Sequence, residues 1–391
     1  MTSGYVTEWP EGCPRVLMTD CWLQNAGDAA IAVATQRMIH RIAPGAVILH
    51  AAYGVDLIGD RYPELAFVPP LDALLGTRWA EPQAGIGVDG PRLVAGADLV
   101  FSQGGGFLRE GYQPWSRVDA LLRATDIVGS VALLGQTIGV FTAAFGRTAM
   151  NQLLRRSNAV VVRDALSRAS AIDLGANAAR VHLGADFSLD IVTHPASGRG
   201  VPADPREGIG VVLSDHVVSG ESEGRVEVAA RLLAAVIAES GSAPVTVWSS
   251  SQGLPGFSED DVVARAAVER IPARARGRVR VVSGHLDAFD LYRLSASFAS
   301  LASMRLHPAL LAAAYGIPSV LVMSDPKVEL FDGSPMRDRV VTGHDQASAT
   351  RAARMAVEPA PAGEMDHLLG PVSERLAENE RVVGELLASV R

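Results

Sequence analysis

The chain has 391 residues, a length that favours two domains over one. Its 35 Lys and Arg residues against 43 Asp and Glu residues give a formal net charge of −8, which excludes a sequence-wide attraction to nucleic acid or to an anionic membrane. Hydrophobic residues make up 48% and charged residues 20%, so disordered, collagen-like and coiled-coil states are excluded as the main form.

Short runs rich in β-branched residues alternate with helical patterns along the first half of the chain. An amphipathic helix is predicted over 29–42. Strands are predicted at 15–19, 46–50, 98–102, 131–135 and 159–162. Such alternation is typical of parallel βαβ units with helices on both faces of the sheet, so the predicted fold class is α/β.

A linker is predicted at 194–207, because this segment holds three prolines and two glycines and shows no apolar periodicity. It separates a first domain at 1–193 from a second domain at 208–391. The second domain repeats the alternation, with helices at 225–239 and 260–270 and strands at 208–213, 245–249, 279–282, 298–301 and 319–323. A terminal helix over 364–390 can pack on either domain.

The prediction is therefore two Rossmann-like domains of similar size. Ligands of open α/β sheets bind beyond the carboxyl ends of the strands, so two such domains suggest a cleft between them.

Cysteine content and hydropathy favour a cytoplasmic protein. Cys13 and Cys21 show no C-x-x-C spacing and cannot form a disulfide framework for a chain of this size. The longest uncharged stretch, 127–146, is about 20 residues long but contains four glycines, which favours a buried strand and loop over an integral membrane segment. The histidines are scattered and form no H-E-x-x-H pattern, so neither a metal nor another cofactor is predicted. The oligomeric state is left open.

The segment 303–318 is the first candidate site. Pro308 suits the first position of a helix and Gly316 the residue after its end, which makes His307 the predicted N-cap. Helix N-termini expose unpaired N–H groups and partial positive charge, so Arg305 and His307 lie where an anion would bind. The alternative is that Arg305 pairs with a surface acid and that His307 only caps the helix.

Arg163 and Asp164 form the second candidate, at the carboxyl end of the strand predicted at 159–162. Asp164 is predicted to cap the next helix. Arg163 points either into a cleft or to a structural partner.

Two loops complete the candidates. Asp28, after Asn25 and just before the first helix, can cap that helix, orient a sugar hydroxyl or act as a base. Gly104 and Gly105, after the strand at 98–102, either let the backbone approach a ligand closely or form a simple turn.

Taken in order, these segments resemble the polysaccharide pyruvyltransferase family, over about residues 20–332. The resemblance rests on segments 25–28, 98–106, 135–139 and 305–307, together with Arg163-Asp164 and Ser167, and Lys327 with Phe331. The most specific part is R-L-H followed by an apolar helix and G-I-P.

The resemblance implies a GT-B-like fold and transfer of a pyruvyl group from phosphoenolpyruvate to a sugar hydroxyl pair, which gives a cyclic ketal and releases phosphate. His307 matches the family's essential histidine and is the implied general acid, with Asp28 as the implied acceptor-hydroxyl base or positioning residue. Arg163 and Arg305 match residues implicated in donor binding, and the implied clamp places both on one donor.

Further substrate-binding positions follow from the shared motifs: Asn25, Gly104, Gly105, Gln136 and Lys327. The implied partners are phosphoenolpyruvate and a saccharide or glycoconjugate acceptor of unspecified identity, without nucleic acid. Two alternatives stay open, a GT-B glycosyltransferase that uses a nucleotide sugar and a catalytically silent binding member of the family.

Overall fold

The computed structural model describes residues 5–77, 88–194, 206–215, 224–251, 259–323, 325–332, 334–358 and 366–390. The chain forms two compact units. Unit 1 contains Met1–Leu23, Ile31–Asp190 and Ser373–Arg391. Unit 2 contains Gln24–Ala30 and Ile191–Val372, so the start of the first helix belongs to unit 2.

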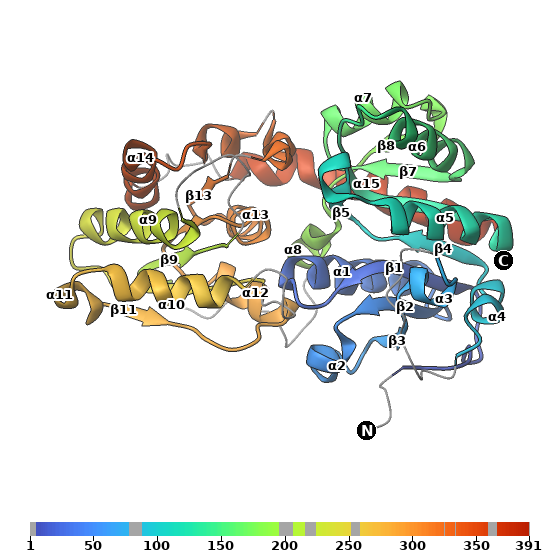
Figure 1. Ribbon diagram of the computed structural model, residues 1–391, viewed down its shortest axis with the longest axis horizontal. Helices are drawn as coiled ribbons and strands as arrows, with labels where there is room; N and C mark the ends of the chain where they lie inside the picture. The colour runs from blue at the N-terminus through green and yellow to red at the C-terminus, as the bar shows by residue number, and fades with distance from the viewer. Residues whose placement is uncertain are drawn as a thin grey trace. The chain divides into compact units, whose positions relative to one another are not determined.

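Unit 1 is built on an eight-stranded sheet in which every recorded strand pair is parallel (Figure 1). The strand order is β3-β2-β1-β4-β6-β7-β8, and β5 pairs with β6. The strands are β1 Arg15–Trp22, β2 Val47–Tyr53, β3 Ala66–Val68, β4 Leu99–Ser102, β5 Gly105–Leu108, β6 Val131–Ile138, β7 Ala159–Val162 and β8 Val181–Leu183. The helices are α1 Ala26–Ile42, α2 Val55–Ile58, α3 Leu71–Leu74, α4 Gly90–Ala95, α5 Trp115–Val128, α6 Ala144–Arg156 and α7 Ala165–Asp173. The short helix α8, Asp190–Thr193, begins at the last residue of this part of unit 1 and continues into unit 2.

Apolar side chains of the sheet and its covering helices form the core of unit 1. All eight residues of β6 are buried, as expected for a central strand with helices on both faces. Leu17, Val100 and Leu133 of neighbouring strands share one core cluster with Leu121 of α5 and Leu153 of α6. Each such fully buried side chain contributes about 1.5–3 kcal/mol relative to exposure.

Unit 2 is built on a six-stranded sheet with the order β11-β10-β9-β12-β13-β14, and its recorded strand pairs are also parallel. The strands are β9 Ile209–Val212, β10 Val245–Trp248, β11 Val279–Val281, β12 Ser300–Ser303, β13 Ser319–Val322 and β14 Val340–Val341. The helices are α9 Arg225–Glu239, α10 Asp260–Arg270, α11 Ala273–Arg276, α12 Ala288–Ser295, α13 Leu306–Ala314 and α14 Gln346–Val357.

Each sheet has a point at which the strand order reverses. In unit 1 the chain runs from β1 through β2 to β3 and then returns to place β4 on the other side of β1. In unit 2 the chain runs from β9 through β10 to β11 and then places β12 beside β9. Crevices for ligands open at the carboxyl ends of the strands at such points, so the β1/β4 and β9/β12 edges are where each unit can bind one.

The last helix, α15 (Asp366–Ala388), is anchored in unit 1 from Ser373 onward. The side chain of Asn379, which is fully buried, accepts a hydrogen bond from the Ala185 N–H and donates one to the Ala185 carbonyl. Among the described helices, none combines the length and the apolar character that crossing a membrane would require.

Two sequence predictions in unit 2 miss the observed boundaries by two residues. The strand predicted at 298–301 is β12, which begins at Ser300 and extends to Ser303, because its backbone pairs with β9 as far as Val212. The helix predicted to begin at Pro308 is α13, which begins at Leu306 after an extended Arg305 with φ −119° and ψ 141°. Pro308 is therefore the third helical residue, where its missing N–H still costs no helical hydrogen bond.

The end of α13 is confirmed. Gly316 has φ +70°, and its N–H donates to the Ala313 carbonyl while the Ile317 N–H donates to that of Ala312. These two bonds form the Schellman arrangement that glycine favours after a helix.

Candidate functional site

The N-terminal turns of α1 and α13 meet in unit 2, although the two helices lie far apart in the sequence. Gly27 lies in the first turn of α1 and packs so closely on His307 that a Cβ atom there would lie 2.1 Å from the imidazole Nδ1. His307 is the second residue of α13 and is 9% exposed. Two helix starts that lie side by side bring their partial positive charges together, which favours binding of an anion.

Asn25 and Asp28 hold the start of α1 in this place. The Asn25 amide donates to the Asp28 carboxylate at 2.9 Å, and its carbonyl oxygen accepts from the Gly27 N–H at 3.0 Å. Asn25 forms an antiparallel bridge with Ser251, and the Ala26 N–H donates to the Ser250 carbonyl. The structure therefore brings three predicted site residues, Asn25, Asp28 and His307, into one part of unit 2.

Arg305 lies at the β9/β12 edge and is held by two carboxylates. Its Nε donates to Asp260 Oδ2 at 2.8 Å, and its Nη2 donates to Asp260 Oδ1 at 2.6 Å and to Asp215 Oδ1 at 3.4 Å. Ser303 Oγ fixes the Arg305 backbone by donating to its carbonyl and accepting from its N–H. These carboxylates offset the charge of the guanidinium, whose side chain is 17% exposed.

Burial raises the pKa of Asp260 above its ordinary value, and the charge of Arg305 opposes that rise. Sequence reasoning did not anticipate Asp215 or Asp260 as partners of Arg305, because they are 90 and 45 residues away and only the sheet order joins them.

Arg163, at the end of β7 in unit 1, is 1% exposed. Its Nη1 pairs with Asp186, and its Nε donates to Thr137 Oγ1 at 2.8 Å. Contact with a substrate would require this guanidinium to leave Asp186. Asp164 caps α7 as predicted, accepting from both the N–H and the hydroxyl of Ser167.

Gln136 and the glycines also make close contacts within unit 1. The Gln136 amide nitrogen donates to the Gln103 carbonyl at 2.6 Å and to Ser102 Oγ at 3.1 Å, and the side chain is fully buried. A Cβ atom on Gly104 would lie 2.8 Å from the Gly135 carbonyl oxygen, and one on Gly105 would lie 2.5 Å from the Phe107 ring. Gly104 therefore lets the chain between β4 and β5 pass close to β6, whereas Gly105 leaves room for the Phe107 ring of its own strand.

Lys327 lies in the 3₁₀ helix Pro326–Phe331 of unit 2, where its N–H donates to the Asp325 carboxylate at 2.9 Å. Its side chain is half-buried.

Sequence reasoning missed Asp20, which lies at the β1/β4 edge of unit 1. Asp20 has φ +67°, a left-handed conformation that is uncommon for any residue other than glycine, at an irregularity in the pairing of β1 with β2. Its carboxylate is 4% exposed, accepts from Ser102 Oγ at 2.8 Å and lies 3.3 Å from Arg117 Nε. No residue pattern marks such a backbone conformation in the sequence.

Burial raises the pKa of Asp20 from its ordinary value to about 6, although Arg117 and the Ser102 hydroxyl counteract the rise. The folded state therefore holds this proton more tightly than the unfolded chain, so stability is lost as the pH rises from about 4 through about 6. This rise in the pKa of Asp20 corresponds to a loss of about 3 kcal/mol of folding stability at a pH well above 6.

We therefore expect Asp20→Asn, which keeps a neutral side chain at every pH and tolerates the left-handed backbone, to raise the melting temperature at about pH 8 and not at about pH 4. Thermal unfolding at both pH values measures this difference. A melting temperature that rises equally at both values would contradict the assigned titration.

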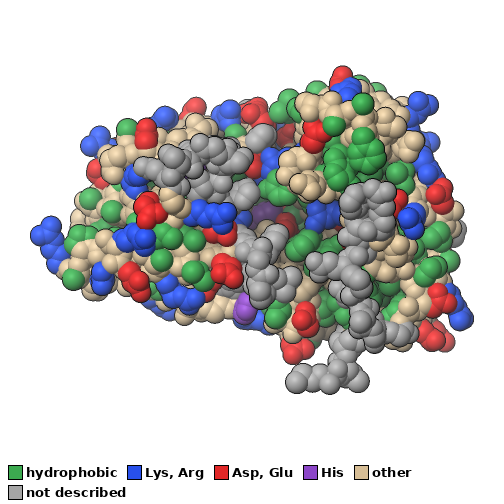
Figure 2. Space-filling view, viewed as in Figure 1, with side chains coloured by type: hydrophobic (Ala, Val, Ile, Leu, Met, Phe, Trp, Pro, Cys, Tyr) green, Lys and Arg blue, Asp and Glu red, His purple; other side chains and the backbone are tan. Residues whose placement is uncertain are grey.

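Acidic and basic side chains are interspersed over the surface in Figure 2. Within the described ranges, no group of three or more His, Cys, Asp or Glu side chains has an arrangement that could hold a metal ion.

Two parallel α/β sheets, each with polar side chains at its point of reversal, define a GT-B-like fold. A family model described as "Polysaccharide pyruvyl transferase" matches residues 25–326. The chain belongs to this family and is a transferase. No curated protein matches its sequence.

Solved structures share the fold at very low sequence identity. A UDP-GlcNAc 2-epimerase from Neisseria meningitidis bound to UDP-GlcNAc has a TM-score of 0.58 and 8% identity, with 96% of this chain and 100% of that chain covered. MnaA of S. aureus with UDP has a TM-score of 0.59 and 6% identity over 93% and 97% of the two chains. Alr3699/HepE of Anabaena with UDP-glucose has a TM-score of 0.56 and 13% identity over 96% and 99%. At such identities the likeness concerns the fold alone.

Proposed function

We propose that this protein transfers the pyruvyl group of phosphoenolpyruvate to two hydroxyls of a saccharide or glycoconjugate, forming a pyruvyl ketal and releasing phosphate. One observation carries the proposal: the segment with Asn25 and Asp28 and the distant segment with His307, which both carry the family resemblance, lie together where two helix N-termini meet. Phosphoenolpyruvate carries a phosphate and a carboxylate, and the partial positive charge of two helix starts suits both.

The protons of the proposed reaction balance without an external acid or base. His307 donates a proton to the methylene carbon, which becomes the methyl group, and the first hydroxyl adds to C2 as it loses its proton. The C2–O bond to phosphate then breaks with its electron pair going to phosphate, and the second hydroxyl adds to C2. Of the two hydroxyl protons, one restores His307 and the other leaves with phosphate. Asp28 is the proposed base or positioning group for an acceptor hydroxyl.

The remaining predicted residues take proposed supporting roles. Arg305, fixed by Asp215 and Asp260, is proposed to contact the donor with the part of its guanidinium that is exposed. Lys327 is proposed to add charge to the same unit. Arg163 is proposed to act indirectly, by fixing the positions of Thr137 and Asp186.

In unit 1, Gln136, Gly104 and Gly105 are proposed to support substrate binding by shaping the ends of β4, β5 and β6. A cytoplasmic location remains part of the proposal, and both cysteines are free thiols, Cys13 exposed and Cys21 buried.

The competing function is transfer from a nucleotide sugar, and ligand binding separates the two. Phosphoenolpyruvate is expected to raise the melting temperature of the wild type and to release phosphate when saccharide is added, whereas UDP is expected to produce no shift. A shift with UDP and none with phosphoenolpyruvate would replace the proposal with the glycosyltransferase alternative.

Gly27 tests the position of His307 without changing the histidine. Gly27→Ala is expected to displace the imidazole, since the new Cβ would lie 2.1 Å from Nδ1. Misplacing a catalytic group by about 1 Å costs on the order of 100-fold in rate. Steady-state phosphate release measures the loss.

Gly277→Ala is the matched control, because a Cβ atom at that position would meet nothing within 4 Å. Full activity of Gly27→Ala, with its melting temperature unchanged, would show that the contact between the helix starts does not matter for the reaction.

A further inference from the structure

Arg117 in unit 1 is an arginine whose terminal nitrogens form no hydrogen bond among the described residues. It lies in the first turn of α5, with its guanidinium carbon 4.4 Å from the centroid of the Phe107 ring and 5.3 Å from that of Trp22. Its one recorded ion pair joins Nε to Asp20 Oδ1 at 3.3 Å. Within the part of the chain that the structure describes, no hydrogen bond occupies Nη1 or Nη2.

The surroundings of Arg117 fix its position and leave it accessible. Trp22 stacks on Tyr53 with ring centroids 4.2 Å apart and an interplanar angle of 16°, so the ring that faces the guanidinium is itself immobilised. The Arg117 side chain is 16% exposed, compared with 1% for Arg163. Two rings and a carboxylate thus hold a planar, permanently charged fork whose terminal nitrogens remain available.

Asp20 adopts an unfavourable conformation and environment in this arrangement. A left-handed backbone and a buried carboxylate both destabilise the folded protein, and each persists only where surrounding structure enforces it. Ser102 Oγ donates to Asp20 and accepts from Gln136, so a hydrogen-bonded chain fixes the carboxylate across the ends of β1, β4 and β6. The carboxylate thereby orients Nε of Arg117.

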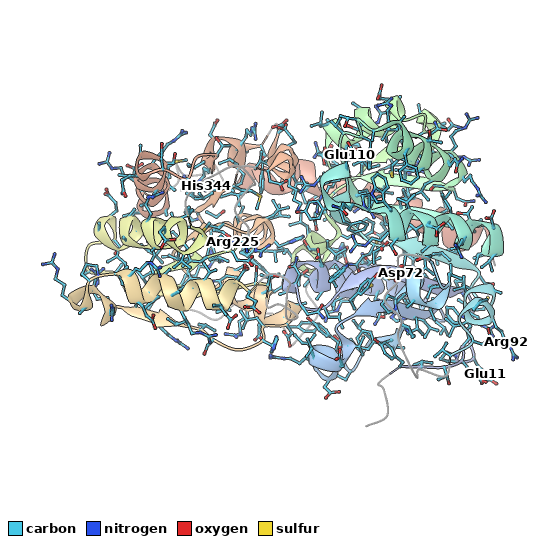
Figure 3. The ribbon with its side chains drawn as sticks, in the orientation of Figure 1. Glu11, Asp72, Arg92, Glu110, Arg225 and His344 are labelled. Carbon is cyan, nitrogen blue, oxygen red and sulfur yellow. The ribbon has the colours of Figure 1, made fainter. Side chains whose placement is uncertain are left out.

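The charge balance here favours a neutral ligand over an anion. Asp72, labelled in Figure 3, accepts from the Tyr53 hydroxyl at 2.9 Å and from Ser116 Oγ at 2.7 Å, and it acts electrostatically on both Asp20 and Tyr53. Asp20 pairs with the guanidinium and Asp72 acts on Asp20, so two carboxylates share this place with one arginine, which disfavours a ligand as negatively charged as phosphoenolpyruvate. Mixed donors and acceptors at a sheet's point of reversal suit a polyhydroxylated ring.

We propose that Arg117 binds hydroxyl groups of the saccharide acceptor through Nη1 and Nη2, and that Asp20 is the residue that positions it. This assignment rests on the proposed pyruvyl transfer for the identity of its ligand as an acceptor. It differs from the sequence-based expectation, in which Arg163 was the substrate-binding arginine of this part of the chain.

Saccharide binding without donor tests the assignment. The probes are the methyl glycosides of glucose, galactose, mannose and N-acetylglucosamine, each added at high millimolar concentration and followed by saturation-transfer NMR. Arg117→Met is expected to weaken binding of the glycoside that the wild type binds by about 10- to 100-fold, the usual cost of losing hydrogen bonds to a charged group. Arg117→Lys keeps the charge but loses the planar fork, so it should retain only part of the wild-type affinity for the glycoside.

Asp20→Asn tests whether Asp20 acts by positioning Arg117 or whether its replacement damages the fold in general. It is expected to raise the saccharide KM in phosphate-release assays several-fold while changing kcat little, and to leave the thermal shift with phosphoenolpyruvate unchanged. Arg123→Met and Asp119→Asn are matched controls, because they form an exposed pair further along α5 and should change neither reading.

Unchanged glycoside binding in Arg117→Met would overturn the assignment, and so would failure of every glycoside to bind the wild type. Glycoside binding is measured without phosphoenolpyruvate, so it can fail while phosphate release from phosphoenolpyruvate still occurs, and only the assignment of Arg117 is then lost. If a glycoside binds but no pyruvyl group is transferred, the proposed reaction is lost and a saccharide site remains.

Discussion

Replacing His307 by Ala or Gln is expected to reduce phosphoenolpyruvate-dependent phosphate release by about 10²- to 10⁴-fold, the range that a general acid contributes. The reason is that His307 is the proposed proton donor at the joined starts of α1 and α13. The imidazole is largely buried, at 9% exposure, against Gly27, so its loss also opens a space beside that glycine. The comparison is made on kcat/KM, with donor binding measured separately by thermal shift.

His285→Gln provides the matched control, since this histidine also belongs to unit 2 and its side chain is exposed. It should retain the activity of the wild type. If His307→Gln retained full activity while its melting temperature stayed unchanged, the proton would have to come from another group, and the assignment of His307 would be withdrawn.

Replacing Arg305 by Met is expected to have the largest effect on stability. Asp260, whose side chain is 0% exposed, would lose both hydrogen bonds from the guanidinium, and Asp215 would lose a third. Removing one partner of a buried ion pair costs about 3–5 kcal/mol, because the remaining charge stays buried without compensation. Hydrogen exchange of peptides that contain β9 and β12, followed by mass spectrometry, should show a loss of protection in unit 2.

A second change in the same chain should reverse part of that loss. Arg305→Met combined with Asp260→Asn removes the uncompensated charge and is expected to recover protection without recovering activity. The control is Arg270→Met, which breaks an exposed pair with Glu227 and should cost less than about 1 kcal/mol. Equal protection in the wild type and Arg305→Met would contradict the view that this arginine compensates two buried carboxylates.

Long periodic elements of the fold were predictable from sequence because each carries its own hydrophobic pattern. The strand Ala159–Val162 and the helices Arg225–Glu239 and Asp260–Arg270 have the predicted bounds. The strands β3, β8 and β14 have only two or three residues, too few for a period to show. The strand β5 begins with two glycines, which the sequence presents as a loop, and it forms only because β6 lies beside it.

The site was predictable where a helix start marks it. Asn25, Asp28 and His307 were identified through motifs at two helix N-termini, and the structure joins them through Gly27, whose importance only the packing reveals. The partners of the arginines were not predictable from spacing along the chain. The order of strands in the sheets brings Asp260 beside Arg305 and Asp186 beside Arg163.

The most direct test of the central claim is mass spectrometry of a saccharide panel incubated with phosphoenolpyruvate and the wild-type protein, once in ordinary water and once in deuterium oxide. Pyruvyl transfer predicts a product with one pyruvyl ketal, one phosphate released for each ketal formed, and one deuterium in the new methyl group when the solvent is deuterated. No ketal in any product, or a ketal whose methyl group carries no solvent deuterium, would contradict it.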